Sequence, residues 1–171
     1  MLRTFLSVVA ALALSACAAD AEEGPAPPPA LELTGRVVDA AGILSTDFER
    51  ELTGRLAKLE DETQVQLVVA TTPDLADRAI ADYSLDLARA WGIGHADRSD
   101  GLLLLVAPAE RKVRIEVGRG LEASVKDEVT AQILRDDVLP QFGTGDFESG
   151  IRVGVDALAG EVTPSNLKEA A

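Results

Sequence analysis

The stretch that decides the fold is residues 101–117, which read GLLLLVAPAERKVRIEV. Residues 101–107 form a continuous apolar run, which is typical of a strand that is covered on both faces. Residues 112–117 alternate polar and apolar side chains, as a half-exposed strand does. Because the turn between them has only four residues, the two strands are expected to form an antiparallel hairpin. The pairs that this hairpin predicts are Ala107 with Lys112, Leu103 with Glu116, and Gly101 with Gly118.

Strands and helices alternate around this hairpin. Apolar runs predict further strands at 37–39 and 65–70. We expect Ser124 and Asp127 to form a capping box at the start of one helix, and Pro140 to end it. The alternation predicts an α/β sandwich with a mixed β-sheet. Apolar side chains at three- and four-residue spacing predict helices over about 45–59, 74–91, 124–138 and 146–158.

The composition excludes several classes of function. The chain has 171 residues, with 16 basic and 29 acidic side chains and a net charge of −13. So acidic a chain repels phosphate backbones, and it has no basic patch, so we expect no nucleic-acid partner. One cysteine and one histidine rule out an intramolecular disulfide and any multi-cysteine or multi-histidine metal site. Oxygen chemistry remains, either the binding of a hard cation or catalysis by carboxylates.

The N-terminus has the features of a targeting segment. Residues 1–16 read MLRTFLSVVAALALSA, a basic residue and a short apolar core followed by small residues, which indicates a signal peptide. With Cys17 they resemble the bacterial lipoprotein signal; an ordinary secretory signal with a chance cysteine is the alternative. The resemblance implies a lipid on Cys17 and a periplasmic domain in the cell envelope, and Ala18 in place of aspartate favours the outer membrane. Residues 17–32 are interpreted as a tether rich in Ala, Pro and acid, and 161–171 as a flexible tail.

Acidic side chains are expected to gather at one edge of the sheet. The hairpin register brings the loop 95–100 next to the turn 118–122. Several carboxylates within reach of one point repel each other unless a cation neutralises them, and Ca²⁺ tolerates irregular oxygen ligands better than Mg²⁺ does. An acidic, solvated loop is the alternative. The candidate metal ligands are Asp97, Asp100, Glu116 and Glu122, with Asp39 if the first strand lies alongside.

Gly118 and Gly120 belong to the string GRGLEA, which superficially matches a dinucleotide-binding fingerprint. We expect no nucleotide cofactor, because no strand with a terminal acid follows about 20 residues later. The two glycines are instead expected to permit a tight turn, at which a small anion can rest on the N-terminus of the next helix.

Four blocks of the sequence carry a family resemblance. In this order and spacing they resemble the TPM domain, which bacterial envelope proteins share with photosystem II repair proteins of chloroplasts and cyanobacteria. The resemblance covers residues 33–160 and implies an αβα sandwich, in which helices flank a mixed sheet. It also implies an acidic pocket at the sheet edge, which holds a divalent cation in relatives. The blocks are GRVVDAAGILS at 35–45, WGIG at 91–94, DGLLLLV at 100–106 and RKVRIEVGRGLE at 111–122.

The chain departs from the family pattern at one point. The usual string before the apolar strand is Asp-Asn-Gly, and here it is Ser99-Asp100-Gly101. One acid has therefore moved by a residue, for which Asp97 can compensate. The acidic positions that match the family are Asp39, Asp100, Glu116 and Glu122.

Two functions of different classes follow. The first is an envelope lipoprotein whose bound cation orders the loop 95–100 against the turn 118–122, so that a protein partner can dock during envelope assembly or maintenance. The second, implied by plant relatives described as acid phosphatases, is metal-assisted hydrolysis of phosphomonoesters, with Asp100 as the candidate ligand or nucleophile. Arg98 and Arg119 pointing into the pocket would favour the enzyme. A structural spacer without a ligand is the third possibility.

Overall fold

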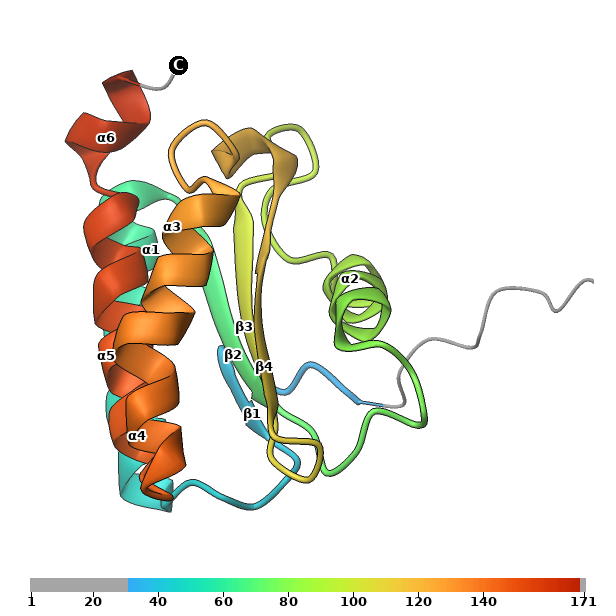
Figure 1. The fold of residues 1–171 in the computed structure, drawn as a ribbon. Coiled ribbons are helices and arrows are strands. Elements are labelled where there is room, and N and C mark those ends of the chain that lie inside the picture. Colours follow the sequence, from blue (N-terminus) through green and yellow to red (C-terminus); the bar gives the residue numbers. More distant parts are fainter. Residues whose placement is uncertain (1–30, 170–171) are drawn as a thin grey trace, which may run out of the picture.

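The computed structural model describes residues 31–169 (Figure 1). The expected signal peptide, Cys17 and the tether up to residue 30 lie outside the described residues. The strands are β1 (Val37–Asp39), β2 (Gln66–Thr71), β3 (Gly101–Ala107) and β4 (Lys112–Val117). The helical segments are α1 (Thr46–Thr63), α2 (Ile80–Trp91), η1 (Arg119–Leu121), α3 (Asp127–Gln132), η2 (Ile133–Val138), α4 (Leu139–Gly143), α5 (Phe147–Glu161) and α6 (Pro164–Glu169).

The strands form one mixed sheet in the order β1-β2-β3-β4. The strands β1, β2 and β3 are parallel, and β4 is antiparallel to β3. The predicted hairpin register is confirmed, since Leu103 pairs with Glu116 and Ala107 with Lys112. Beyond the last pair, the Gly118 N–H donates to the Gly101 carbonyl over 2.8 Å. The register therefore extends into the residues that approach the candidate site.

Helices cover both faces of the sheet, which confirms the expected αβα sandwich (Figure 1). On one face α1 and α5 contribute Leu52 and Ile151 to a core with Leu104. On the other face α2 contributes Leu87 to a separate core with Leu103. All of β3 is buried, because its successive side chains enter the two cores in turn. Burial on both faces explains the continuous apolar run of this strand.

The two helical crossovers lie on opposite faces of the sheet. The strands β1, β2 and β3 are parallel neighbours in chain order, so both connections step in the same direction. Two right-handed connections in one direction would place their helices on one face. Because α1 and α2 pack against opposite faces, one of the two crossovers is left-handed, which is uncommon. Of the described helices, α2 alone covers its face, and the candidate site lies beside its C-terminal half.

The predicted start of the second helix is wrong. The helix α2 begins at Ile80 rather than near residue 74. Ala76 and Asp77 have positive φ values of 50° and 59°, a left-handed conformation that a right-handed helix does not contain. The segment from 72 to 79 is therefore a loop.

The helix after the hairpin also differs from expectation. It begins at Asp127 with Lys126 as the N-cap residue and no side-chain cap, so the capping box predicted for Ser124 is wrong. Pro140 does not end it, because a π-helical segment precedes the proline and α4 continues past it. In this segment the Leu139 N–H donates to Leu134, five residues back. The wider turn moves the carbonyls that a proline ring would otherwise meet.

The C-terminal segment adds one more element. The range 161–171, expected to be a flexible tail, contains the short helix α6. None of the helices in residues 31–169 is long and apolar enough to cross a membrane.

Candidate functional site

The loop that precedes β3 lies against the turn that follows β4. The backbone of Gly120 donates to the Ser99 carbonyl over 3.0 Å, in addition to the bond between Gly118 and Gly101. A Cβ atom built on Gly118 would overlap the Ser99 carbonyl oxygen, and one on Gly120 would overlap the Arg98 carbonyl oxygen. Loop and turn therefore meet backbone to backbone. The two glycines make this approach possible, which is the tight-turn role expected of them.

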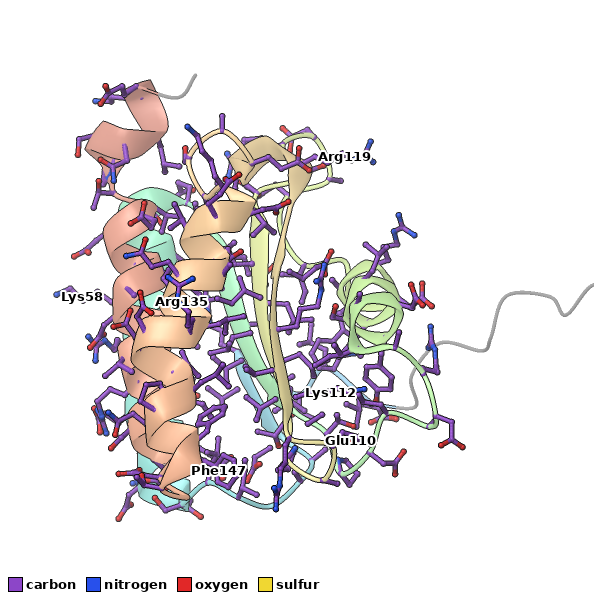
Figure 2. All side chains as sticks on the ribbon, viewed as in Figure 1. Lys58, Glu110, Lys112, Arg119, Arg135 and Phe147 are labelled. Carbon is purple, nitrogen blue, oxygen red and sulfur yellow. The ribbon has the colours of Figure 1, made fainter. Side chains whose placement is uncertain are left out.

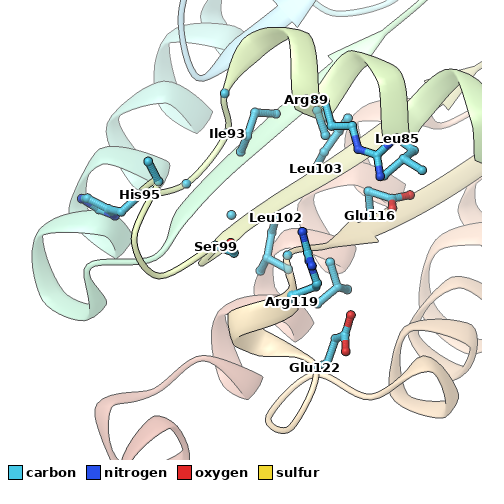
Figure 3. Close-up of a pocket in the computed structure, with 17 residues that line it drawn as sticks. Leu85, Arg89, Ile93, His95, Ser99, Leu102, Leu103, Glu116, Arg119 and Glu122 are labelled. Carbon is cyan, nitrogen blue, oxygen red and sulfur yellow. The ribbon is translucent and has the colours of Figure 1, made fainter.

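A pocket of about 400 Å³ opens where this loop, this turn and α2 come together (Figure 3). One face of α2 supplies part of the wall, and β3, β4 and the turn supply the rest. The apolar lining residues are Leu85, Ala88, Ile93, Ala96, Leu102, Leu103 and Val117. The side chains that carry charge in this lining are Arg89, Glu116, Arg119 and Glu122.

Glu116 is the acid that β4 contributes to the pocket. Its Oε2 atom accepts hydrogen bonds from the buried Ser84 hydroxyl and from Arg114 Nε, each over 2.9 Å. A carboxylate opposite a strand that is buried on both faces needs a cationic partner, and Arg114 is that partner here. The Oε1 atom of Glu116 makes no hydrogen bond to any residue in 31–169. It is the oxygen that remains available to a ligand.

Asp100 has a different role from the one predicted. It is 7% exposed and accepts hydrogen bonds from the His95 backbone N–H (2.7 Å) and from Arg98 Nε (2.5 Å). The His95 Nδ1 atom lies 3.0 Å from the same carboxylate and 2.8 Å from Arg98 Nη2. Arg98 also donates to the Gln64 carbonyl over 3.1 Å. Burial opposes ionisation of the Asp100 carboxyl, but the hydrogen bonds from His95 and Arg98 outweigh it and hold its pKa below the usual value. Asp100 therefore fastens the loop, and it does not line the pocket.

Asp39 lies at the other end of the sheet. It ends β1 beside Thr71, at the end where β3 finishes, whereas Asp100 precedes β3. Figure 2 shows that Arg119, which lines the pocket, lies at the opposite end of the hairpin from Lys112. Lys112 pairs with Ala107 at the end of β3, which is the end of the sheet where Asp39 lies. The Asp39 carboxylate accepts hydrogen bonds from the Thr71 hydroxyl and from the backbone N–H groups of residues 43 and 44. It stabilises the loop after β1.

The structure thus brings two of the five predicted ligands, Glu116 and Glu122, to the pocket. Asp97 is exposed and forms no hydrogen bond or ion pair within the described part of the chain. In that part, no group of three or more acidic, histidine or cysteine side chains is arranged to hold a metal ion. The other three stay away for different reasons. Asp39 ends β1 at the opposite end of the sheet, Asp100 is paired with an arginine, and Asp97 is exposed.

The arginines are also distributed differently from expectation. Arg98 pairs with Asp100 instead of pointing into the pocket, while Arg119 does line the pocket. Arg89 is a pocket residue that sequence reasoning missed. A signal for it was present, because residues 85, 88, 89 and 92 have the spacing of one helix face, and all four line the pocket.

These features define a class of protein, an αβα sandwich with a ligand-sized pocket of mixed charge between a helix and a hairpin. The model of the TPM domain matches residues 37–161, and the chain belongs to this family. A comparison with curated proteins finds no significant match.

Solved structures of similar domains support the same fold. The N-terminal domain of a P. gingivalis protein is 35% identical, with a TM-score of 0.72 over 79% of this chain and 85% of that one. The N-terminal domain of a Corynebacterium glutamicum protein is 14% identical, with a TM-score of 0.61 over 81% and 86%. A protein of Bizionia argentinensis is 18% identical, with a TM-score of 0.61 over 74% and 83%. The last two likenesses show the fold alone.

Proposed function

We propose that this chain is an envelope lipoprotein whose TPM domain binds a divalent cation in the pocket beside α2 and serves as a binding module for an envelope protein. The observation that carries the proposal is the presence of Glu116 and Glu122 in one pocket, with Oε1 of Glu116 available. The signal-like residues 1–16 and Cys17 support the lipid anchor and a periplasmic location.

The residues present fit a loosely held cation. Ca²⁺ takes six to eight oxygen ligands. The two carboxylates would supply the smaller part of these, and backbone carbonyls and water would supply the others. We therefore expect a dissociation constant of roughly 10⁻⁴–10⁻³ M, as in weak extracellular calcium sites. Mg²⁺ is expected to bind less well, because it demands near-ideal octahedral geometry.

The same geometry changes the expected mechanism. The loop 95–100 is held by Arg98 and His95 on Asp100, so its order does not depend on a cation. A cation at Glu116 and Glu122 would instead join β4 to the residue that follows η1. The docking surface for a protein partner is accordingly placed at the turn 118–122 and the adjacent wall of α2.

Calcium titration of residues 18–171, which include every described residue, tests this proposal. We expect amide NMR shifts concentrated at residues 116–122, with weaker responses to magnesium. Glu122→Gln removes a ligand charge and should weaken calcium binding about tenfold. Glu169→Gln, an exposed acid on α6, is the matched control and should bind like the unmodified chain. Uniform shifts over all acidic residues, or equal effects of the two variants, would refute a site in the pocket.

Metal-assisted phosphomonoester hydrolysis is the second candidate. One observation favours it, because the guanidinium groups of Arg89 and Arg119 line the same pocket as Glu122 and can offset the charge of a phosphate. Asp100 is not the nucleophile in this version, since its oxygens are occupied by protein donors, and an activated water takes that place.

A hydrolysis assay with p-nitrophenyl phosphate, with and without calcium or magnesium, tests this candidate. We expect Arg119→Gln to lower turnover by at least about tenfold, because a guanidinium contact with the transferring group is lost. Arg111→Gln, an exposed arginine outside the pocket, should leave turnover unchanged. Metal-independent turnover, or turnover equal in the two variants, would assign the activity to a contaminant and remove this candidate.

A further inference from the structure

Three charged side chains of the pocket have no partner within the described part of the protein. Arg89, Arg119 and Glu122 line the pocket and form no hydrogen bond or ion pair with any residue in 31–169. All three are exposed, so a ligand can reach them. They are therefore free to bind groups of opposite charge.

Unpaired arginines are uncommon in this acidic chain, which has 29 acidic and 16 basic side chains. Arg111, in the turn between β3 and β4, is the only other described arginine without a salt bridge. That two of these three lie in one pocket indicates an oxyanion partner, which guanidinium groups bind with paired hydrogen bonds. The described arginines that do form salt bridges are Arg36, Arg50, Arg55, Arg78, Arg98, Arg114, Arg135 and Arg152.

Positive and negative side chains alternate across this pocket. Figure 3 shows them in the order Arg89, Glu116, Arg119 and Glu122. Glu116 is paired with Arg114 through Oε2, which leaves two guanidinium groups and the Glu122 carboxylate without a partner among the described residues. A metal ion alone would leave both arginines without a partner, and an anion alone would leave the Glu122 carboxylate without one. A ligand that carries both charges satisfies all three groups.

We infer that the pocket binds a small zwitterion, an α-amino acid with an apolar side chain. Its carboxylate pairs with Arg89 and Arg119, and its ammonium group pairs with Glu122. The side chain packs against Leu85 and Ile93 on the apolar wall. A volume of about 400 Å³ lies within the range of small-molecule sites, and a ligand without net charge is not repelled by a protein of charge −13.

This inference goes beyond the proposed cation site and is separable from it. Both ligands use Glu122, so calcium and the amino acid are expected to compete. Only the amino acid uses Arg89 and Arg119. A phosphorylated amine such as ethanolamine phosphate shares the two charges but has no apolar side chain to place on the wall formed by α2.

Titration of residues 18–171 with leucine and its derivatives tests the inference. Leucine is expected to shift the amide NMR signals of residues 89–94 and 116–122. Leucinamide lacks the carboxylate and N-acetylleucine lacks the ammonium group, so each should bind at least about tenfold more weakly, because one charge-assisted contact is lost. Ethanolamine phosphate should also bind more weakly than leucine. Binding of either leucine derivative as tight as that of leucine would overturn the inference, as would tighter binding of ethanolamine phosphate or a lack of any leucine response.

Matched variants locate the binding. Arg119→Gln should weaken leucine about tenfold without weakening calcium, because it removes a positive charge beside Glu122, while Arg111→Gln should change neither. Glu122→Gln should weaken both ligands. A protein that binds leucine but not calcium would refute the cation site alone. A protein that binds calcium but not leucine would refute the zwitterion alone, and equal leucine binding by the two arginine variants would place the ligand elsewhere.

Discussion

Replacing Gly118 by alanine is expected to destabilise the domain by about 3 kcal/mol, from overpacking together with loss of a backbone hydrogen bond. The added Cβ would overlap the Ser99 carbonyl oxygen and crowd that of Gly101. Both neighbours are backbone atoms, so no side-chain rotation relieves the overlap. The loop must instead move away from the turn, which breaks the hydrogen bond between Gly118 and Gly101. Denaturation by urea, followed by circular dichroism, measures the loss.

Gly54→Ala is the matched control, with an expected change of opposite sign. Gly54 lies inside α1, and a Cβ built on it meets no atom within 4 Å. Alanine there is expected to stabilise the domain by up to about 1 kcal/mol, since it favours the helix over the unfolded chain. A denaturation midpoint of Gly118→Ala at or above that of the unmodified chain would contradict the backbone contact between loop and turn.

The hairpin was predictable because its evidence is local. A continuous apolar run, a short turn and an alternating run fix which residues face each other, and the pairing of Leu103 with Glu116 followed directly. The approach of Gly118 to Gly101 is a consequence of the same register. For this part of the site, spacing along the sequence directly predicts which residues lie close together.

The position of Asp39 was not predictable in the same way. It depends on which end of the sheet β1 leads to, and the parallel order of β1, β2 and β3 is set by packing of helices on both faces. Asp39 ends β1, whereas Asp100 directly precedes β3. Parallel strands place these two positions at opposite ends of the sheet, so the two acids cannot share a ligand.

The hydrogen bonds of the Asp100 carboxylate could not be predicted from the sequence. Arg98 and His95 are close to Asp100 along the chain, but spacing did not show that both would turn inward to its carboxylate. The positive φ of Ser99, 52°, bends the loop between Arg98 and Asp100. The sequence analysis expected a cation to offset the repulsion among these acids. An arginine two residues away supplies the compensating charge instead.

Asp100→Asn is accordingly expected to destabilise the domain by about 2 kcal/mol at pH 7, the scale of hydrogen bonds to a charged group. Asparagine retains one carbonyl oxygen for the His95 backbone N–H. Its NH₂ group faces Arg98 Nε, which can only donate, so the hydrogen bond from Arg98 is lost. Asp97→Asn is the control: that side chain is exposed and forms no hydrogen bond or ion pair within residues 31–169, so the stability of this variant should match that of the unmodified chain.

The difference between the unmodified chain and Asp100→Asn should shrink on acidification. The pKa of Asp100 is lowered in the folded state, so its ionised form stabilises the fold fully above the unfolded value of about 3.9. This contribution is lost as the pH falls from there through the lower folded pKa, where the folded chain must also take up the proton. Urea denaturation at pH 7 and at successively lower pH measures the difference. A difference that stays constant as the pH falls below the unfolded value would show that the ionised carboxylate does not hold the loop, and that Arg98 owes its position to the Gln64 carbonyl instead.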